Sequence, residues 1–177
     1  IKRQEATIDL IASENYASQD ILDILGSPLT NKYSEGYPGK RYYPGNEIYD
    51  KIENLAKDRA LKVFGLSPEK WSANAQSYSG SPANLAIYAA LMEPGDVLMG
   101  MKLASGGHLT HGHKVNLSGK IYKSVQYGVN EKTRLIDYEE AARLAKQYKP
   151  KVIVSGLTAY PRKSDFKRFG DIAKSAG

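Results

Sequence analysis

Apolar residues recur at helical spacing from residue 47 onward. Ile48, Ile52 and Leu55 fall on one face of a helix, and Gly65 marks its end because glycine is favoured just past a helix C-terminus. The spacing therefore predicts an amphipathic helix that stops at Gly65. Similar patterns predict helices over residues 18–25, 82–91, 138–148 and 166–175, the first of them capped by Ser18.

Short apolar runs between these helices predict strands. Val152-Ile153-Val154 follows Pro150 and separates two amphipathic helices, which is the pattern of a buried central strand. Strands that alternate with helices are typical of an α/β domain with a mostly parallel sheet covered by helices. The predicted strands span residues 71–76, 97–101, 121–126 and 151–155.

Residues 9–45 follow a different pattern. They are rich in Gly, Tyr, Ser and Asn, and after Leu25 they show no apolar period of a helix or a strand. The sequence therefore predicts an extended arm in which the helix at 18–25 is the only regular element.

The composition, with 41% hydrophobic and 25% charged residues, is that of an ordinary soluble globular protein. No run of 18 apolar residues occurs, so a membrane span is not expected. The absence of cysteine excludes disulfides, thiolate metal ligands and a cysteine nucleophile. Because it is also compatible with a reducing compartment, we expect a cytoplasmic protein.

The net charge of +6 favours anionic ligands such as phosphate groups, carboxylates or nucleic acid. Alternatively, acidic residues elsewhere in a longer protein balance this charge. The chain begins with Ile1 rather than Met and ends at Gly177 just past a predicted helix, so we interpret it as part of a longer protein. An organellar form is compatible with the sequence, because a targeting segment would precede Ile1.

The turn at Ser79-Gly80-Ser81 is predicted to join a strand to the helix at 82–91. A helix N-terminus presents unpaired N–H groups and a positive dipole end, and Gly80 lets the backbone approach a ligand closely. The turn therefore suits a phosphate group. The alternative is a plain serine N-cap with Pro82 in the first helical turn.

Three histidines, His108, His111 and His113, lie within six residues. As a metal site this cluster is poor, because the flanking glycines do not support a helix that would align the imidazoles and no carboxylate lies within it. We therefore expect no metal. A second interpretation is that Gly106 and Gly107 clear space for the imidazole of His108 to lie flat against an aromatic cofactor ring.

Residues 31–43 combine tyrosines with basic side chains. This favours either an RNA surface, on which bases stack, or an arm that packs on a partner subunit. Glu35 is the only acid in the segment. Surrounded by tyrosines, its carboxylate is a candidate for proton transfer, and the alternative is a surface ion pair with Lys32 or Lys40.

Four segments together resemble the serine hydroxymethyltransferase family in order and spacing: Leu10-Ile11-Ala12-Ser13-Glu14-Asn15, residues 31–43, Ser79–Asn84 and Gly106–Gly112. The resemblance covers nearly the whole chain. It implies fold type I of the pyridoxal phosphate (PLP) enzymes, related to aspartate aminotransferase, with a three-layer α/β/α large domain and a mostly parallel sheet. Residues 1–46 would then be an arm that contacts a partner subunit, and residues 47–177 an incomplete PLP-binding large domain.

The same resemblance implies the activity. The family transfers a one-carbon unit between serine and tetrahydrofolate, producing glycine and methylenetetrahydrofolate, with PLP as cofactor and tetrahydrofolate as co-substrate. It implies L-serine, glycine and tetrahydrofolate as partners, and a homodimer, or a tetramer of two such dimers, with shared active sites. Neither a membrane nor a nucleic acid is expected as a partner.

Roles for the cofactor-facing residues follow from the resemblance. Ser79, Gly80 and Ser81 would hold the cofactor phosphate. His108 would stack on the pyridine ring and count among the catalytic residues. Thr158 stands where the family usually has a serine that hydrogen-bonds the phenolic oxygen, so a hydroxyl is retained.

The arm would supply residues to a neighbouring subunit's site. Glu35 would handle a proton at the substrate hydroxyl or the folate, Tyr33 would contact the cofactor, and Ser13 and Tyr43 would bind the substrate. The pocket for the pterin and aminobenzoate groups would be lined by Leu103, Gly107 and Leu109.

The resemblance also implies what lies beyond Gly177. The aspartate that pairs with the pyridine nitrogen, the Thr-His-Lys segment with the imine-forming lysine, and the arginine that binds the substrate carboxylate are all expected there. We therefore expect the isolated chain to be inactive.

Overall fold

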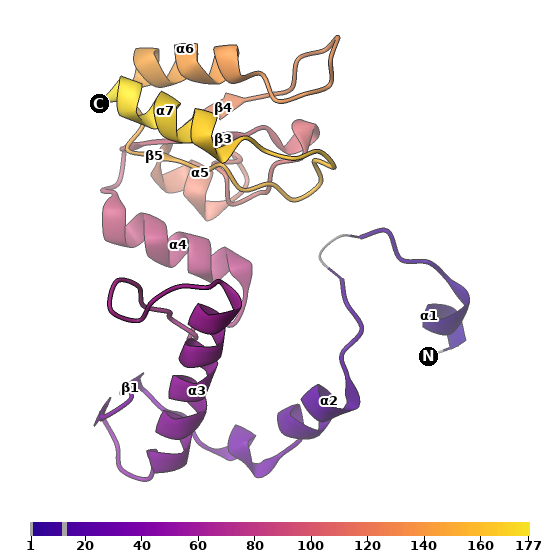
Figure 1. Ribbon diagram of the computed structural model, residues 1–177, viewed down its shortest axis with the longest axis vertical. Helices are drawn as coiled ribbons and strands as arrows, with labels where there is room; N and C mark the ends of the chain where they lie inside the picture. Colours follow the sequence, from indigo (N-terminus) through magenta and orange to yellow (C-terminus); the bar gives the residue numbers. More distant parts are fainter. Residues whose placement is uncertain (1, 12–13) are drawn as a thin grey trace. The chain divides into compact units, whose positions relative to one another are not determined.

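The computed structural model describes residues 2–11 and 14–177 (Figure 1). Their contacts form two compact units, one of residues 15–78 and one of residues 79–177 together with the described residues before 15, which include helix α1 (Lys2–Ala6). The functional division into an arm at 1–46 and a large domain from 47 onward stays a prediction. None of the described helices is long and apolar enough to span a bilayer.

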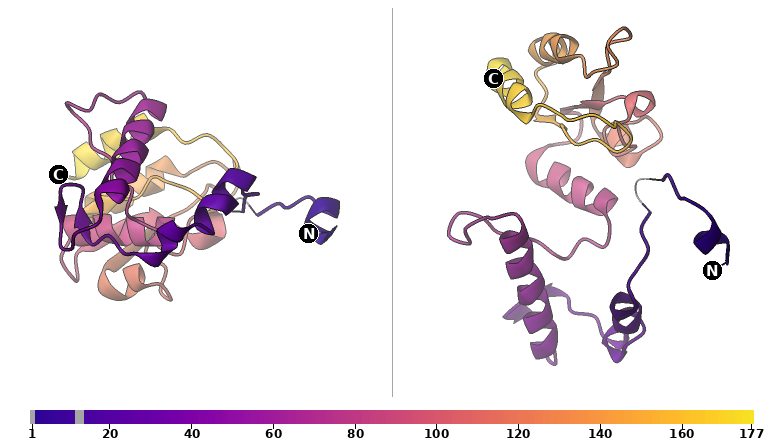
Figure 2. Two further views of the ribbon diagram at one scale, coloured as in Figure 1. Left: turned by 90° about the horizontal axis from the view of Figure 1, so that it is seen from below. Right: turned by 45° about the vertical axis from the view of Figure 1, so that its right-hand side comes forward.

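The unit from residue 79 onward is layered. Its three-stranded parallel sheet has the order β4-β3-β5 and consists of β3 (Val97–Met101), β4 (Lys123–Tyr127) and β5 (Val152–Ile153). Helix α4 (Gly80–Leu91) packs on one face, and α6 (Tyr138–Tyr148) and α7 (Phe166–Ala176) pack on the other (Figures 1 and 2). The short η2 (Leu103–Ser105) and α5 (Leu117–Ile121) connect β3 to β4. This confirms the α/β class with a parallel sheet.

The side chains of β3 separate two core layers, because successive strand residues point to opposite faces of a sheet. Leu98 packs with Tyr88 and Met92 on the α4 side. Met99 and Met101 pack with residues of α6 and α7 on the other side. These three β3 side chains are 0% exposed, and burial of each stabilises the fold by about 1.5–3 kcal/mol.

The helices on the second face begin at aspartate caps. The carboxylate of Asp137 accepts a hydrogen bond from the backbone N–H of Glu140 at 2.8 Å, at the start of α6. Asp165 accepts one from the N–H of Arg168 at 3.0 Å, at the start of α7. Each cap satisfies an otherwise unpaired donor of the first turn, which fixes where the helix begins.

Two strand predictions need correction. The apolar run Val152-Ile153-Val154 was predicted to be central, but β5 pairs only with β3 and lies at an edge of the described sheet. Helix cover on both faces makes a strand apolar wherever it stands in the order. The strand predicted over 71–76 is wrong, because this segment is irregular and Gln76 bonds to Asn74 and Gly36 instead of a ladder partner.

The other predicted elements are confirmed with small shifts at their ends. The strand predicted over 121–126 begins at Lys123, because the side chain of Asn116 caps α5 by accepting from the N–H of Ser118 and that helix includes Ile121. Helix α4 starts at Gly80, two residues before the predicted start. The helix at 18–25 is α2 (Gln19–Leu25), with Ser18 as N-cap residue, although the Ser18 hydroxyl makes no capping hydrogen bond to the described backbone.

The unit of residues 15–78 contains more structure than the predicted arm. After α2 come η1 (Pro28–Asn31) and a hairpin of β1 (Gly36–Tyr37) and β2 (Lys40–Arg41), followed by α3 (Glu47–Val63). The hairpin turns so tightly that a Cβ on Gly36, whose φ is +98°, would collide with the carbonyl oxygen of Lys40. Only glycine is easily accommodated there.

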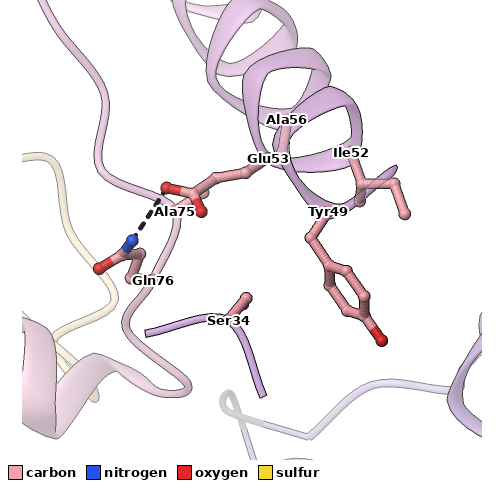
Figure 3. A pocket seen from close by; sticks show the side chains of 7 residues that line it. All are labelled: Ser34, Tyr49, Ile52, Glu53, Ala56, Ala75 and Gln76. Atoms are coloured by element: carbon pink, nitrogen blue, oxygen red, sulfur yellow. Dashed lines mark hydrogen bonds between the residues drawn. The ribbon is translucent and has the colours of Figure 1, made fainter. Parts of the chain in front are cut away.

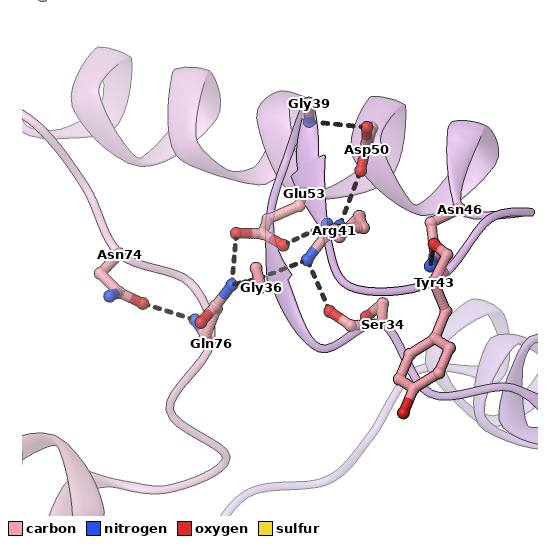
Figure 4. A network of polar contacts seen from close by, with 10 residues as sticks. All are labelled: Ser34, Gly36, Gly39, Arg41, Tyr43, Asn46, Asp50, Glu53, Asn74 and Gln76. Atoms are coloured by element: carbon pink, nitrogen blue, oxygen red, sulfur yellow. Dashed lines mark hydrogen bonds and ion pairs between the residues drawn. The ribbon is translucent and has the colours of Figure 1, made fainter.

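Arg41 joins this hairpin to α3 (Figure 4). Its guanidinium, in a side chain only 5% exposed, donates to the carboxylates of Asp50 at 2.8 Å and Glu53 at 2.7 Å. It also donates to the carbonyls of Ser34 and Gly36, both at 2.7 Å. The N–H of Gly39, followed by Arg41, lowers the pKa of Asp50. The planar fork of arginine satisfies four acceptors at once, which lysine cannot do.

The apolar face of α3 is largely uncovered within its own unit. Ile48, Ile52 and Leu55, whose spacing predicted the helix, are 56%, 44% and 49% exposed. Leu61 is the buried residue of α3. The period therefore predicted the helix correctly, whereas the surface that would cover its apolar face is not supplied by the described residues of this unit.

Candidate functional site

A cavity of ≈ 430 Å³ lies at the carboxyl ends of β3 and β5, where the loops after these strands meet the N-terminus of α4. Ligands of parallel α/β sheets bind at this edge. The cavity brings together five residues predicted from the sequence to hold a cofactor: Ser79, Gly80, Ser81, His108 and Thr158. It is further lined by Asn84, His111, Val154, Gly156 and Leu157.

The N-terminus of α4 is open toward a ligand. Ser79 is its N-cap residue in extended conformation, and its hydroxyl makes no capping hydrogen bond to the described backbone. Ser79 and Pro82 thus stand where the N-cap alternative places them, but the Ser79 hydroxyl is not used for capping. A Cβ on Gly80 would meet no atom of the described residues within 4 Å. Free N–H groups, a spare hydroxyl and open space form a cradle that fits a phosphate group.

The ring of His108 is held by its own loop. Its Nδ1 accepts a hydrogen bond from the backbone N–H of Thr110 at 3.1 Å and lies 2.8 Å from the hydroxyl of Thr110. The backbone N–H of His108 donates to Nδ1 of His111 at 3.1 Å. Nδ1 of His113 accepts from the N–H of Val115 at 3.4 Å. Nδ1 of each imidazole thus accepts a hydrogen bond from a nearby backbone N–H. Among the described residues no metal-ligating group of three is formed.

Gly106 explains how Thr158 reaches the same cavity. The N–H groups of Thr158 and Ala159 both donate to the carbonyl of Gly106, at 2.9 and 3.0 Å. Gly106 has a φ of +107°, and a Cβ there would lie 2.6 Å from the backbone nitrogen of Tyr160. The glycine therefore allows the chain that follows β5 to approach closely, and its predicted role of clearing space beside the imidazole stays a prediction.

The three residues predicted to line a folate pocket lie on one turn after β3. Leu103 and Leu109 are 43% and 38% exposed, so apolar surface is available there. Gly107 is buried, and a Cβ on it would collide with the carbonyl oxygen of Met101. The structure thus gives Gly107 a steric reason of its own, and the folate role of all three stays a prediction.

The predicted residues of the arm lie in the other unit. The rings of Tyr33 and Tyr43 meet edge to face with centroids 5.4 Å apart, and their hydrogen bond raises the pKa of Tyr33. Glu35 is exposed and is not enclosed by tyrosines in this unit. The predicted alternative, an ion pair with Lys32 or Lys40, is likewise absent from the described residues. Ser13 lies outside the described residues.

A second cavity, of ≈ 410 Å³, lies in the unit of residues 15–78 (Figure 3). Tyr49, Ile52 and Glu53 of α3 form one side of it, and the segments at Ser34 and Gln76 form the other. None of the predicted site residues that the structure describes lines this cavity. The amide of Gln76 donates to Glu53 at 3.0 Å across it, so its polar side belongs to the Arg41 network.

Sequence reasoning missed residues that support the site through hydrogen bonds to its loops and to each other. Asn84 and Thr110 are joined by a hydrogen bond of 2.8 Å across 26 residues of sequence. His111 was noticed only as a metal ligand, yet it is 4% exposed and holds the backbone of His108. The usable signal for Asn84 was its position one helical turn after Gly80, which places it on the same face of α4.

We expect His111 to make stability depend on pH. Burial, with a smaller contribution from the nearby charge of His108, lowers the pKa of His111 from 6.5 to about 4. The unfolded chain therefore binds more protons than the folded chain between these two values, and stability falls as the pH falls through this window. The loss is at most about 3.5 kcal/mol at about 1.4 kcal/mol per pKa unit, and partial solvent access reduces it. Urea unfolding of the 177-residue chain at a series of pH values measures it.

His111→Gln should flatten this pH dependence, because the buried ionisable group is gone. His113→Gln is the matched control, because it makes the same chemical change at a histidine that is only partly buried. An unaltered slope in His111→Gln would contradict the assignment of a buried, neutral His111.

Comparison with known proteins is consistent along the whole chain. A family model described as "Serine hydroxymethyltransferase" matches residues 1–177. "Serine hydroxymethyltransferase 4" of Colwellia psychrerythraea is 57% identical over 176 residues, and so is "Serine hydroxymethyltransferase" of Acinetobacter baumannii. In both cases the alignment covers 99% of this chain and 41% of the relative. The chain therefore spans well under half the length of these relatives.

Proposed function

The chain belongs to the serine hydroxymethyltransferase family, and from that premise we propose that it forms the cofactor-facing part of an enzyme that transfers a one-carbon unit between serine and tetrahydrofolate. One observation carries the proposal. Residues from three separate segments, Ser79-Gly80-Ser81, His108 and Thr158, line a single cavity at the edge of the sheet where α/β proteins bind ligands. The layered sheet agrees with an incomplete large domain of the PLP-transferase fold.

The residues present fit PLP. The open N-terminus of α4 and the unused hydroxyl of Ser79 suit the phosphate. His108 offers a flat face for the pyridine ring, and the hydroxyl of Thr158 a hydrogen bond for the phenolic oxygen. When bound, PLP supplies a ring that accepts the electrons released as the Cα–Cβ bond of serine breaks. The chain's own residues would hold and orient this group.

The remaining roles are proposed from family membership. Glu35 moves a proton at the substrate hydroxyl or the folate, and its exposed side chain on a fixed backbone is suited to serve a site outside its own unit. Tyr33 contacts the cofactor, and Ser13 and Tyr43 bind the amino-acid substrate. The folate rings pack on the exposed apolar surface of Leu103, Gly107 and Leu109.

A homodimer, or a tetramer of such dimers, in the cytoplasm completes the proposal. The exposed apolar face of α3 supports it, because Ile48, Ile52 and Leu55 would lose favourable burial if they stayed in water. A subunit interface is the usual cover for such a face.

The activity is tested in the protein that carries this chain at the full length of its relatives. Conversion of serine to glycine should require tetrahydrofolate. A rate of serine cleavage independent of folate would overturn the proposal and favour another fold type I activity.

The cradle is tested in the 177-residue chain with pyridoxine phosphate, which lacks the aldehyde and so cannot react with surface lysines. Gly80→Ala should weaken binding at least about tenfold, because the methyl group occupies space next to the N–H groups of α4. Its stability should be unchanged or slightly higher, since alanine is the better helix former. Calorimetric titration measures the affinity, with unphosphorylated pyridoxine as comparison.

Gly170→Ala is the matched control, because Gly170 is also a helical glycine with open space around its Cβ position. It should bind pyridoxine phosphate as the unsubstituted chain does. Equal affinity of Gly80→Ala and Gly170→Ala would remove the α4 turn from the proposed phosphate site.

A further inference from the structure

A line of hydrogen bonds runs from α4 to the imidazole of His108. The side-chain amide of Asn84 lies 2.8 Å from the hydroxyl oxygen of Thr110 and donates to it. That hydroxyl lies 2.8 Å from Nδ1 of His108. The backbone N–H of Thr110 lies 3.1 Å from the same nitrogen.

The donor and acceptor at each step follow from elementary chemistry. A backbone N–H can only donate, so Nδ1 of His108 is an acceptor and carries no proton in the neutral ring. The ring proton therefore resides on Nε2. The hydroxyl of Thr110 has one proton, which it must donate to Nδ1 while its lone pairs accept from Asn84. The hydrogen bonds therefore run in one direction, from the amide of Asn84 through the hydroxyl of Thr110 to Nδ1 of His108.

The surroundings hold this arrangement in place. Thr110 is 0% exposed, so water does not compete for its hydroxyl. The buried imidazole of His111 accepts the backbone N–H of His108 at 3.1 Å. Gly100 of β3 allows this approach, because a Cβ there would lie 2.8 Å from Cβ of His111. Both the ring and the backbone of His108 are therefore fixed from the sheet side.

We propose that Asn84 and Thr110 are positioning residues that hold the imidazole of His108 in its Nε2–H tautomer and fix its ring relative to the N-terminal turn of α4. Asn84 stands one turn after Gly80 on the same rigid helix. The helix therefore sets the spacing between the phosphate cradle and the ring-contacting imidazole. The functional meaning of this spacing rests on the proposed function, whereas the tautomer does not.

The test is the nitrogen-15 spectrum of the three histidine side chains in the 177-residue chain without ligand. His108 should be about nine-tenths or more in the Nε2–H form, because one hydrogen bond of ordinary strength shifts a tautomer ratio by about tenfold. Thr110→Val keeps the shape and removes the hydroxyl, so the Nδ1 resonance of His108 should move toward that of a weaker acceptor. Thr110→Ser should restore it.

Asn84→Asp tests the direction of the line. The new carboxylate accepts the hydroxyl proton of Thr110, which turns a lone pair toward His108, so the Nδ1–H form of that ring should rise several-fold. The resonances of His113, whose Nδ1 bonds within its own turn, should stay unchanged and report an intact fold. If Thr110→Val does not fold, Asn84→Asp alone tests whether these hydrogen bonds set the tautomer of His108.

Ligand binding separates positioning from general damage. Thr110→Val should bind pyridoxine phosphate about tenfold more weakly but inorganic phosphate equally well, since only the ring contact is disturbed. A proton on Nδ1 of His108 in the unsubstituted chain, or a His108 spectrum unaffected by both substitutions, would overturn the proposal. If the unsubstituted chain shows the expected tautomer but does not bind pyridoxine phosphate, the proposed function fails. The positioning role of Asn84 and Thr110 toward His108 is then still supported.

Discussion

Replacing Arg41 by Met should release the 36–41 hairpin from α3. The substitution keeps most of the side chain's volume but leaves the carboxylates of Asp50 and Glu53 and the carbonyls of Ser34 and Gly36 without their shared donor. Removing one partner of a buried charge network strongly destabilises the fold, because it leaves the other charges buried without compensation. We expect hydrogen exchange of the hairpin amides to accelerate on the order of 100-fold or more.

Exchange of residues 36–41 measured by mass spectrometry, together with the fluorescence of the single tryptophan, Trp71, reports this change in the unit of residues 15–78. Arg59→Met is the matched control, because Arg59 is an exposed arginine of the same helix α3. Arg41→Lys should fall between the two, since an ammonium group cannot reach all four acceptors. Unchanged exchange in Arg41→Met would mean that the hairpin is held by other contacts.

The elements predicted correctly are those whose signal is local. The helices at 47–63 and 138–148 and the strand at 97–101 follow from a repeated apolar period and, for α6, an aspartate cap at Asp137. Residues 71–76 also offered a short period, but a strand exists only where a second strand pairs with it, and that partner is not written into the segment. The order β4-β3-β5 could not be predicted for the same reason.

The candidate site divides along the same line. Ser79, Gly80, Ser81 and His108 stand in short segments whose residue types already indicate a turn, a helix start and an aromatic-facing imidazole. The residues that support this site could not be predicted in the same way, because Asn84 and Thr110 are joined by a hydrogen bond across 26 residues of sequence. Gly106 and Gly107 were identified, but the steric contacts that require glycine there were not predicted, and their ligand roles stay predictions. The packing of Gly106 on Tyr160 depends on the tertiary fold alone.

Gly107→Ala should destabilise the unit of residues 79–177 by on the order of 3 kcal/mol, even without any ligand. The added Cβ would collide with the carbonyl of Met101, at the end of a strand whose Leu98, Met99 and Met101 side chains are fully buried. It would also lie 3.0 Å from the carbonyl oxygen of Lys102. Backbone atoms of a central strand cannot yield as a flexible side chain can. Amide exchange along β3 should therefore accelerate on the order of 100-fold.

Gly156→Ala makes the same chemical change in the same unit where no described atom lies within 4 Å of the new Cβ, and it should alter exchange along β3 little. The comparison also separates the two roles offered for Gly107. If the glycine serves only to leave room for a folate ring, Gly107→Ala would keep native exchange and lose folate affinity in the full-length protein. If glycine is instead required by the nearby carbonyl of Met101, Gly107→Ala lowers stability even without folate. Any loss of folate binding then follows from displacement of the turn that carries Leu103 and Leu109.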